Sequence, residues 1–239
     1  MKGSTMMNGN GNEMATSEEG STSCTLKWAT DKAGEFLKAA NTQALENMYD
    51  DIADKYEEIT HALECNGARL TANALFGLIP NRDIRVLDVG CGIGMVGKEL
   101  FDKGYRDIHG VDISAGMLKV LEKKQIYTKL VKARFDPTTP LEYADGYFDV
   151  IVSCGVFVPA HLTHTCLPEI FRLLKPGGIF IITTRKNVFD EELGDIKLKS
   201  TFAGLIEKGQ LQKISHEEIE YLTDAEKKVS GLILTYKML

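Results

Sequence analysis

The sequence predicts a doubly wound α/β domain, in which helices cover both faces of a mostly parallel sheet. Between about residues 84 and 184, segments with strand periodicity alternate with segments of helical periodicity, and the links between them are short. Three of the strand segments, "VLDV", "DVIVS" and "IFIITT", are apolar on both faces. Strands that lie beneath helices on both sides of a sheet have this composition.

The N-terminal part of the chain divides into a tail and a helical cap. Residues 1–25 are small and polar, cannot offset their own ordering entropy, and are predicted to be disordered. Within residues 31–60, apolar side chains recur at helical spacing. This stripe comprises Phe36, Leu37, Ala40, Ala44, Leu45, Met48, Tyr49, Ile52 and Tyr56. A second helix over residues 67–80 ends at Pro80, so residues 31–80 are expected to form N-terminal cap helices that act as a lid.

The cofactor-binding core is expected over residues 84–184, within a single domain that spans residues 31–239. Its strands are predicted at residues 85–89, 107–113, 127–133, 147–157 and 179–184. Its helices are predicted at residues 94–104, 114–124 and 167–178. Gly104 ends the first of these helices, Ser114 is a suitable N-cap for the second, and a Pro-Gly-Gly turn ends the third.

The C-terminal part, residues 185–239, has a different pattern. A helix is expected over residues 190–209, followed by two strand-like runs at residues 210–223 and 228–239. The short polar segment "DAEK" between the two runs predicts a turn. We therefore expect an antiparallel pair of strands added at the edge of the sheet.

Charge and cysteine content exclude several classes of function. The net charge of −6 and the pI near 5.5 argue against a nucleic-acid partner, because such affinity comes largely from basic residues that neutralise phosphates. Five cysteines without a Cys-x-x-Cys pair argue against a disulfide framework and against a zinc site or other metal centre. No stretch approaches the roughly 18 apolar residues of a membrane span. A cytoplasmic protein without a membrane partner is predicted.

A glycine-rich loop follows the first strand of the core, in "VLDVGCGIGMVG". Gly92, Gly94 and Gly97 fit the dinucleotide-binding pattern, and Asp112 lies twenty residues beyond Gly92. Glycines at such a loop let a ligand approach the backbone closely. An acid at the position of Asp112 can accept hydrogen bonds from both hydroxyls of a ribose. The pattern therefore predicts a nucleoside cofactor without deciding which one.

The carboxylate of Asp88, two residues before Gly90, separates the two cofactor classes. A dinucleotide would place its pyrophosphate against this loop, and two unit charges a few ångströms apart repel by roughly 4 kcal/mol at an effective dielectric constant of about 20. S-adenosylmethionine has no phosphate there and carries an ammonium group and a sulfonium. The acid thus favours S-adenosylmethionine, acting directly or through the hydrogen bonds of the loop.

Four segments in a fixed order, "VLDVGCGIGMVG", "GVDIS", "GYFDVIVSCGVF" and "LLKPGG", resemble motifs of the class I S-adenosylmethionine-dependent methyltransferases. The resemblance covers about residues 49–184. It implies a Rossmann-like methyltransferase fold, with a seven-stranded, mostly parallel sheet and an antiparallel C-terminal strand. Within that family, "MYDDIADKYEEI", "IHGVDISAGML", "LPEIFRLLKPGG" and "TTR" resemble one narrower group of methyltransferase-like proteins.

The resemblance also implies which residues contact the cofactor. Tyr49 and Tyr56 match tyrosines that cover its methionine end, although the same two residues also fit the apolar stripe of a core helix. Asp112 and Ile113 match the ribose and adenine edge, and Met117 would pack under the adenine. The further cofactor contacts expected are Asp88, Gly90, Cys91, Gly92, Gly94, Arg134, Phe135 and Ser153. Relatives place an acid after the third strand, where this chain has Arg134 and Phe135, with Asp136 one residue later.

Methyl transfer requires mainly that the acceptor be aligned with the methyl group, and a base helps where the acceptor loses a proton. His161, just past the fourth strand, is the candidate base, with His164 and Cys154 behind it; the alternative is that both histidines are loop or cap residues. The segment "SCGV" lacks the Pro-Pro-aromatic signature of nucleic-acid amino-methylating enzymes, so a small-molecule acceptor is expected. Two alternatives stay open, an NAD(P)-dependent oxidoreductase and a non-catalytic S-adenosylmethionine-binding protein.

Overall fold

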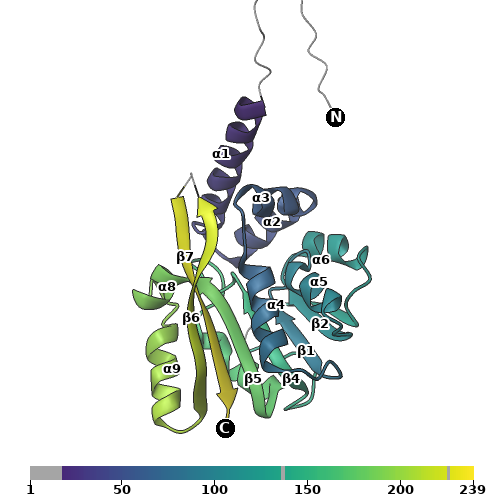
Figure 1. Cartoon of the computed structure of the whole chain (residues 1–239), viewed down its shortest axis with the longest axis vertical. Helices are drawn as coiled ribbons and strands as arrows, with labels where there is room; N and C mark the ends of the chain where they lie inside the picture. The colour runs from purple at the N-terminus through teal and green to yellow at the C-terminus, as the bar shows by residue number, and fades with distance from the viewer. Residues whose placement is uncertain (1–17, 136–137, 225–226) are drawn as a thin grey trace, which may run out of the picture.

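A seven-stranded sheet forms the centre of the protein. The computed structural model describes residues 18–135, 138–224 and 227–239. The strand order is β3-β2-β1-β4-β5-β7-β6, with β7 antiparallel to both of its neighbours and the remaining pairs parallel (Figure 1). The predicted doubly wound sheet with an antiparallel C-terminal strand is confirmed. The strands are β1 (Arg85–Val89), β2 (Asp107–Asp112), β3 (Lys129–Lys132), β4 (Phe148–Cys154), β5 (Leu174–Arg185), β6 (Leu211–Asp224) and β7 (Lys227–Met238).

Helices cover both faces of this sheet because alternate strand residues point to opposite sides. Val150 and Val152 of β4 pack with α4 and α5, whereas Ile151 packs with α7 and α9 on the other face. The core helices are α4 (Gly67–Leu78), α5 (Met95–Asp102), α6 (Ala115–Glu122), α7 (Leu167–Leu173), α8 (Lys186–Asp190) and α9 (Leu198–Glu207), with the 3-10 turn η2 (His164–Cys166) before α7.

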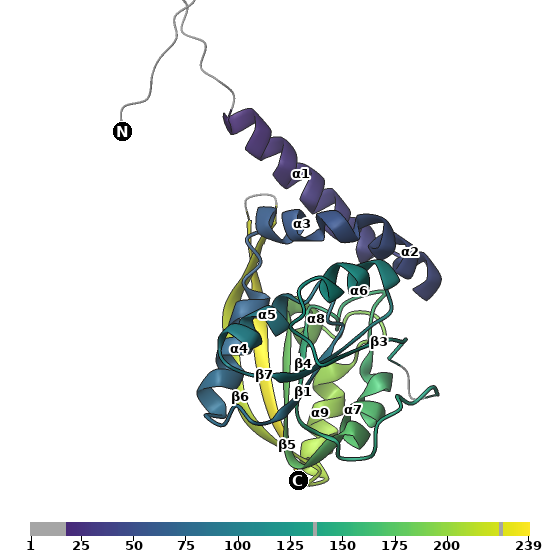
Figure 2. The same ribbon diagram turned by 90° about the vertical axis from the view of Figure 1, so that its right-hand side faces the viewer.

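The N-terminal helices gather at one end of the sheet, beside α6 (Figure 2). They are α1 (Glu18–Phe36), α2 (Thr42–Ile52), the 3-10 turn η1 (Ala53–Lys55) and α3 (Tyr56–Ala62). Asp50 of α2 fixes them to the core, because its Oδ1 accepts hydrogen bonds from the Ser114 hydroxyl at 2.5 Å and from the Gly116 amide at 2.8 Å. Lys132 of β3 adds an ion pair with Glu46 at 2.7 Å.

The structure corrects four boundaries. The helix expected over residues 167–178 ends at Leu173, because β5 begins at Leu174 and contains the Pro-Gly-Gly segment. The sequence predicts a disordered tail over residues 1–25. Residues 1–17 lie outside the described part of the chain. For the remainder the prediction is wrong, because α1 begins at Glu18. The stripe over residues 31–60 is interrupted after Phe36, and α2 starts anew at its N-cap Asn41. The helix expected over residues 190–209 is confined to residues 198–207, since Glu192, Gly194 and Lys197 adopt left-handed backbone conformations.

The last two strands form the predicted antiparallel pair, of which the turn residues 225–226 lie outside the described part of the chain. Among the described residues, no helix combines the length and the apolar character that crossing a membrane requires.

Candidate active site

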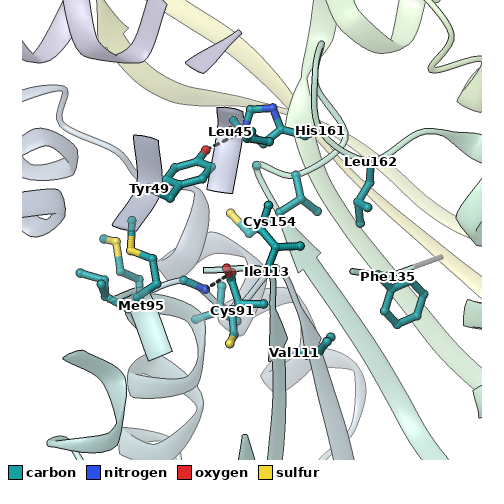
Figure 3. A pocket seen from close by; sticks show the side chains of 18 of the residues that line it. Leu45, Tyr49, Cys91, Met95, Val111, Ile113, Phe135, Cys154, His161 and Leu162 are labelled. Atoms are coloured by element: carbon teal, nitrogen blue, oxygen red, sulfur yellow. Dashed lines mark hydrogen bonds between the residues drawn. The ribbon is translucent and has the colours of Figure 1, made fainter. Parts of the chain in front are cut away.

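A cavity of about 260 Å³ opens where β1, β2 and β4 end, and α2 and α3 close it from above. Crevices beyond the carboxyl ends of parallel strands are the usual ligand sites of such sheets. Figure 3 shows side chains from the two sides facing each other across this space, with Tyr49 and Leu45 from α2 and Ile113 and Cys91 from the loops after β2 and β1. Helices α2 and α3, part of the segment predicted to act as a lid, therefore form one wall of the pocket.

The glycine loop after β1 forms the floor of the cavity. Gly90, Gly92 and Gly94 all have positive φ, at 70°, 51° and 82°, which favours glycine over residues with a Cβ. A Cβ at Gly90 would collide with Val156 and one at Gly94 with Leu121, so both positions are also packed. A Cβ at Gly92 would meet no atom within 4 Å. Gly92 thus leaves open the space that a ligand would fill.

The amide groups of this loop already have partners within the protein. The amides of Gly90 and Cys91 donate to the Val111 carbonyl at 2.9 and 3.1 Å. The Gly92 amide donates to Asp112 Oδ2 at 2.8 Å, and the Gly94 amide to the Cys91 carbonyl at 2.8 Å. Four of the five amides of residues 90–94 are therefore occupied, whereas a phosphate-binding loop presents its amides to the ligand.

Asp112, at the end of β2, projects into the same cavity. Its Oδ2 accepts from Gly92, and its Oδ1 accepts from the Ser114 amide at 2.9 Å. Burial raises the pKa of the Asp112 carboxyl, although these backbone hydrogen bonds act in the opposite direction. Each oxygen has a second lone pair, so the fixed carboxylate can accept hydrogen bonds from a vicinal pair of hydroxyls.

An apolar wall adjoins Asp112. Ile113 and the buried side chains of Met117 and Phe135 line it, and Arg134 lines the cavity beside Phe135. Such a wall suits the flat ring of a nucleobase. Asp136, which the sequence placed near this position, lies outside the described residues.

Tyr49 of the lid is hydrogen-bonded to His161 across the cavity. The Pro159 carbonyl can only accept, so His161 Nδ1 donates to it at 2.8 Å, and Nε2 accepts from the Tyr49 hydroxyl at 2.6 Å. Burial lowers the pKa of His161 and raises that of Tyr49. The pair is consequently a neutral imidazole and a neutral phenol, brought together from positions 112 residues apart. Tyr56 also lines the cavity, so both tyrosines of the stripe face it.

Three of the predicted cofactor contacts, Asp88, Gly94 and Ser153, are not among the residues that line the cavity. Ser153 is fully buried in β4. Asp88 is buried beneath the loop, where its Oδ2 accepts a hydrogen bond from the Tyr127 hydroxyl at 2.6 Å. Burial raises the pKa of the Asp88 carboxyl to about 7. The acid next to the glycines thus supports the loop from behind and does not present its charge to a ligand.

Asp88 makes the stability of the ligand-free protein depend on pH. Its pKa rises from 3.8 to about 7 on folding, so between these values the folded state binds more protons than the unfolded state, and stability falls as pH rises. The free energy of unfolding falls by up to about 4 kcal/mol over this pH range, because each unit of pKa difference corresponds to 1.36 kcal/mol. We expect Asp88→Asn to remove this pH-dependent part of the free energy of unfolding. The measurement is the free energy of unfolding in urea from pH 4 to 8 for both proteins.

The exposed Asp102→Asn serves as the control for that measurement, because Asp102 pairs only with Lys98 on the surface of α5. If the free energy of unfolding changed with pH in the same way for wild type and Asp88→Asn, Asp88 would not be the cause of the pH dependence.

Two further candidates have different surroundings. His164 points away from the cavity, where its Nδ1 donates to the Asp195 carbonyl at 2.9 Å, as the alternative of a loop histidine predicts. Cys154 does line the cavity, but burial raises the pKa of its thiol to about 12, so it is not a nucleophile. Among the described residues, no group of acidic, histidine and cysteine side chains is arranged to hold a metal ion.

Several lining residues had no signal in the sequence. They come from α2 and α3, the link to α4 and its start, the start of α5, the segment between β4 and α7, and strand β6: Thr42, Thr60, Cys65, Gly67, Ala68, Met95, Gly155, Val156, Leu162, Cys166 and Tyr221. Most are small or apolar residues that could equally have been core. Only the fold shows that they converge on one cavity.

Known proteins are similar to this chain in sequence and in fold. Residues 87–182 match the family model described as a methyltransferase domain. Human Methyltransferase-like protein 27 is 32% identical over 143 residues, which are 59% of this chain and 58% of the human protein, so the match spans less than two thirds of that relative. That protein is the one from the Williams–Beuren syndrome chromosome region, to which the narrower resemblance in the sequence pointed.

A bacterial relative covers more of the chain. The Rickettsia bellii protein named Ubiquinone/menaquinone biosynthesis C-methyltransferase UbiE is 26% identical over 198 residues, 79% of this chain and 80% of that protein. The crystal structure of an S-adenosylmethionine-dependent methyltransferase from Mesorhizobium loti superposes with a TM-score of 0.51 at 18% identity, over 69% of this chain and 96% of that chain. At this identity the likeness shows the shared fold. The resemblance to class I methyltransferases predicted from the sequence is confirmed.

Proposed function

We propose that this chain, whose residues 87–182 carry the methyltransferase domain, is an S-adenosylmethionine-dependent methyltransferase with a small-molecule acceptor. The choice of cofactor rests on one observation, which is that most amide groups of the glycine loop already donate hydrogen bonds within the protein. The Gly92 amide, which would bind a pyrophosphate, donates instead to the carboxylate of Asp112. A dinucleotide would have to displace that bond and set its phosphates against a carboxylate, so the NAD(P)-dependent alternative is disfavoured.

The residues of the cavity fit S-adenosylmethionine. Asp112 would hold the ribose hydroxyls, Ile113, Met117 and Phe135 would flank the adenine, and the open side of Gly92 would accept the chain of the amino acid. When bound, the cofactor supplies a methyl group attached to a sulfonium sulfur, which is a good leaving group. The protein contributes alignment of the acceptor and exclusion of water, which the lid provides by closing over the cavity.

Tyr49 and His161 provide a route for a proton. An acceptor hydroxyl beside Tyr49 would give its proton to the phenol oxygen while the phenol proton passes to Nε2 of His161. The tautomer fixed by Pro159 leaves Nε2 free to accept it, and burial keeps the imidazole neutral at pH 7. Tyr49 therefore has two roles in this proposal, as part of the lid and as the contact between acceptor and base.

A small acceptor suits the size of the cavity. Its volume of about 260 Å³ lies just below the ~300–1,000 Å³ range of ligand pockets, so only a small acceptor fits beside a nucleoside cofactor. The relative from Rickettsia bellii is named for quinone biosynthesis, which supports a small-molecule acceptor. A nucleic-acid acceptor is not part of the proposal. A cytoplasmic location is proposed from the thiols of Cys65, Cys91 and Cys154, which form no disulfide.

Calorimetric titration of the purified protein with S-adenosylhomocysteine and with NAD⁺ tests the cofactor. The expected result is a dissociation constant on the order of micromolar for the first and no measurable heat for the second. Gly92→Ala should abolish the first binding, because its methyl group fills the ligand space. Gly194→Ala is the matched control, since Gly194 also has positive φ and open surroundings but lies outside the cavity.

Preference for NAD⁺, or equal loss of S-adenosylhomocysteine binding in both variants, would contradict the proposal. Release of S-adenosylhomocysteine from S-adenosylmethionine in the presence of a panel of uncharged small acceptors then separates an enzyme from a non-catalytic binding protein. The latter would bind the cofactor without any acceptor-dependent turnover.

A further inference from the structure

The part of the cavity beyond the proposed ribose and adenine contacts is formed by residues of which the sequence had identified only Tyr56 and Cys154. We call it the acceptor half and define it by its lining residues Tyr56, Thr60, Cys65, Gly67, Ala68, Cys154, Gly155 and Tyr221. They come from α3, the start of α4, the end of β4 and strand β6. Tyr221 is the only member contributed by β6, which lies at the edge of the sheet.

A β-bulge directs Tyr221 into the cavity. The pairing of β6 with β7 keeps one register from Ser215↔Thr235 to Glu220↔Ser230. It resumes one residue out of step at Leu222↔Val229, which leaves Tyr221 as the extra residue. In a regular strand Tyr221 and Leu222 would point to opposite faces, yet both are buried here. Bulges are common next to active sites, where they re-aim a side chain.

Three glycines make room for the Tyr221 side chain. A Cβ at Gly67 would lie 2.5 Å from its ring, and one at Gly155 would lie 2.7 Å from its hydroxyl. A Cβ at Gly231, on the neighbouring strand β7, would lie 2.7 Å from its Cβ. Contacts this short do not occur between real side chains, so the glycines and the tyrosine fit only as a set. The ring is therefore held in one position at the end of the cavity.

The acceptor half offers hydrogen bonds but no charge. Among the described residues that line it there is no Asp, Glu, Lys or Arg. Burial raises the pKa values of Tyr221 and Tyr56 and that of the Cys65 thiol, so these groups stay neutral. The charged neighbour Arg185, which acts electrostatically on Tyr221 and Cys65, is not a lining residue. A charged acceptor buried among these residues would have no counter-ion from them, which costs free energy.

We infer that Tyr221 contacts the methyl acceptor and that this acceptor is an uncharged, planar ring compound with a hydroxyl group. The inference rests on the proposed function. The rings of Tyr56 and Tyr221 supply flat apolar walls, and the Tyr221 hydroxyl, in hydrogen-bonding reach of the Cys154 thiol, supplies the polar contact that orients the ring.

The test uses naphthol and naphthoate, which share a ring system but differ in charge at pH 7. Both are titrated into the full-length protein saturated with S-adenosylhomocysteine. Naphthol is expected to bind at least about tenfold more tightly than naphthoate, which corresponds to 1.4 kcal/mol. Tyr221→Ala should lower naphthol affinity by at least about tenfold, and Tyr221→Phe, which keeps the ring, by less, because it loses one hydrogen bond. The affinity for S-adenosylhomocysteine should be unchanged in both.

Tyr236→Phe is the matched control, because Tyr236 is a buried tyrosine that stacks on Phe202 and does not line the cavity. Naphthoate binding as tight as naphthol, equal affinities in the Tyr221 and Tyr236 variants, or no naphthol binding to the loaded protein would each overturn the inference and leave the proposed function standing. Failure of wild type to bind S-adenosylhomocysteine would overturn the proposed function itself, and the inference with it.

Discussion

Asp112→Ala is expected to weaken S-adenosylhomocysteine binding by about 10²- to 10⁴-fold, since two charge-assisted hydrogen bonds are each worth about 1.5–3 kcal/mol. The carboxylate is already held by Gly92 and Ser114, so it needs no rearrangement to accept two ribose hydroxyls. Its removal also frees the Gly92 amide and loosens the loop. Calorimetric titration of wild type and variant gives the ratio of dissociation constants.

Two further variants make this result specific. Asp112→Asn keeps the shape and one acceptor oxygen and should fall between wild type and Asp112→Ala. Asp102→Asn removes an exposed carboxylate from α5 and should bind as wild type does. If Asp112→Ala retained wild-type affinity within about threefold, a difference well under 1.4 kcal/mol, Asp112 would not be a ribose contact.

Gly97→Ala is expected to destabilise the fold by about 2–4 kcal/mol, through overpacking and the loss of a buried hydrogen bond. Gly97 is the third glycine of the Gly92-x-Gly94-x-x-Gly97 pattern, yet a Cβ there would collide with the ring and hydroxyl of Tyr127. That hydroxyl accepts from the Gly97 amide at 3.1 Å and donates to Asp88. The measurement is the free energy of unfolding in urea.

Gly204→Ala is the matched control, because Gly204 is also helical but has no atom within 4 Å of an added Cβ. It should gain about 0.5–1 kcal/mol from helix propensity alone. In a Tyr127→Ala background, Gly97→Ala should lose most of its cost, since the colliding ring is gone. Equal effects of Gly97→Ala in both backgrounds would show that the glycine is needed for another reason.

The glycine loop shows how far sequence reasoning reached. The pattern correctly predicted a loop at the carboxyl end of β1, and Asp112 lies in the cavity beside it. The charge of Asp88, however, cannot select the cofactor as the sequence predicts, because this side chain is buried behind the loop and shares a hydrogen bond with Tyr127. The same preference now follows from the occupied amides of the loop. A residue's position in a motif did not reveal which side of the backbone its carboxylate would face.

The tyrosines show the same limit of prediction from the sequence. Helical spacing identified Tyr49 and Tyr56, and the structure brings Tyr49 against His161, the residue singled out as a base. Tyr221 gave no signal, because a bulge is set by pairing between two strands and by glycines from α4, from the loop after β4 and from β7. Alternation along β6 alone would have placed it on the wrong face or among the core residues.

The sequence by itself determined the order of strands and helices, the class of the sheet and the place of the glycine loop, because periodicity and turn chemistry act between residues close in the chain. Only the tertiary structure decided which polar groups meet: Asp88 with Tyr127, Tyr49 with His161, and Tyr221 with the end of the cavity. Such pairs join positions 39 and 112 residues apart, and their burial and protonation depend on everything packed around them.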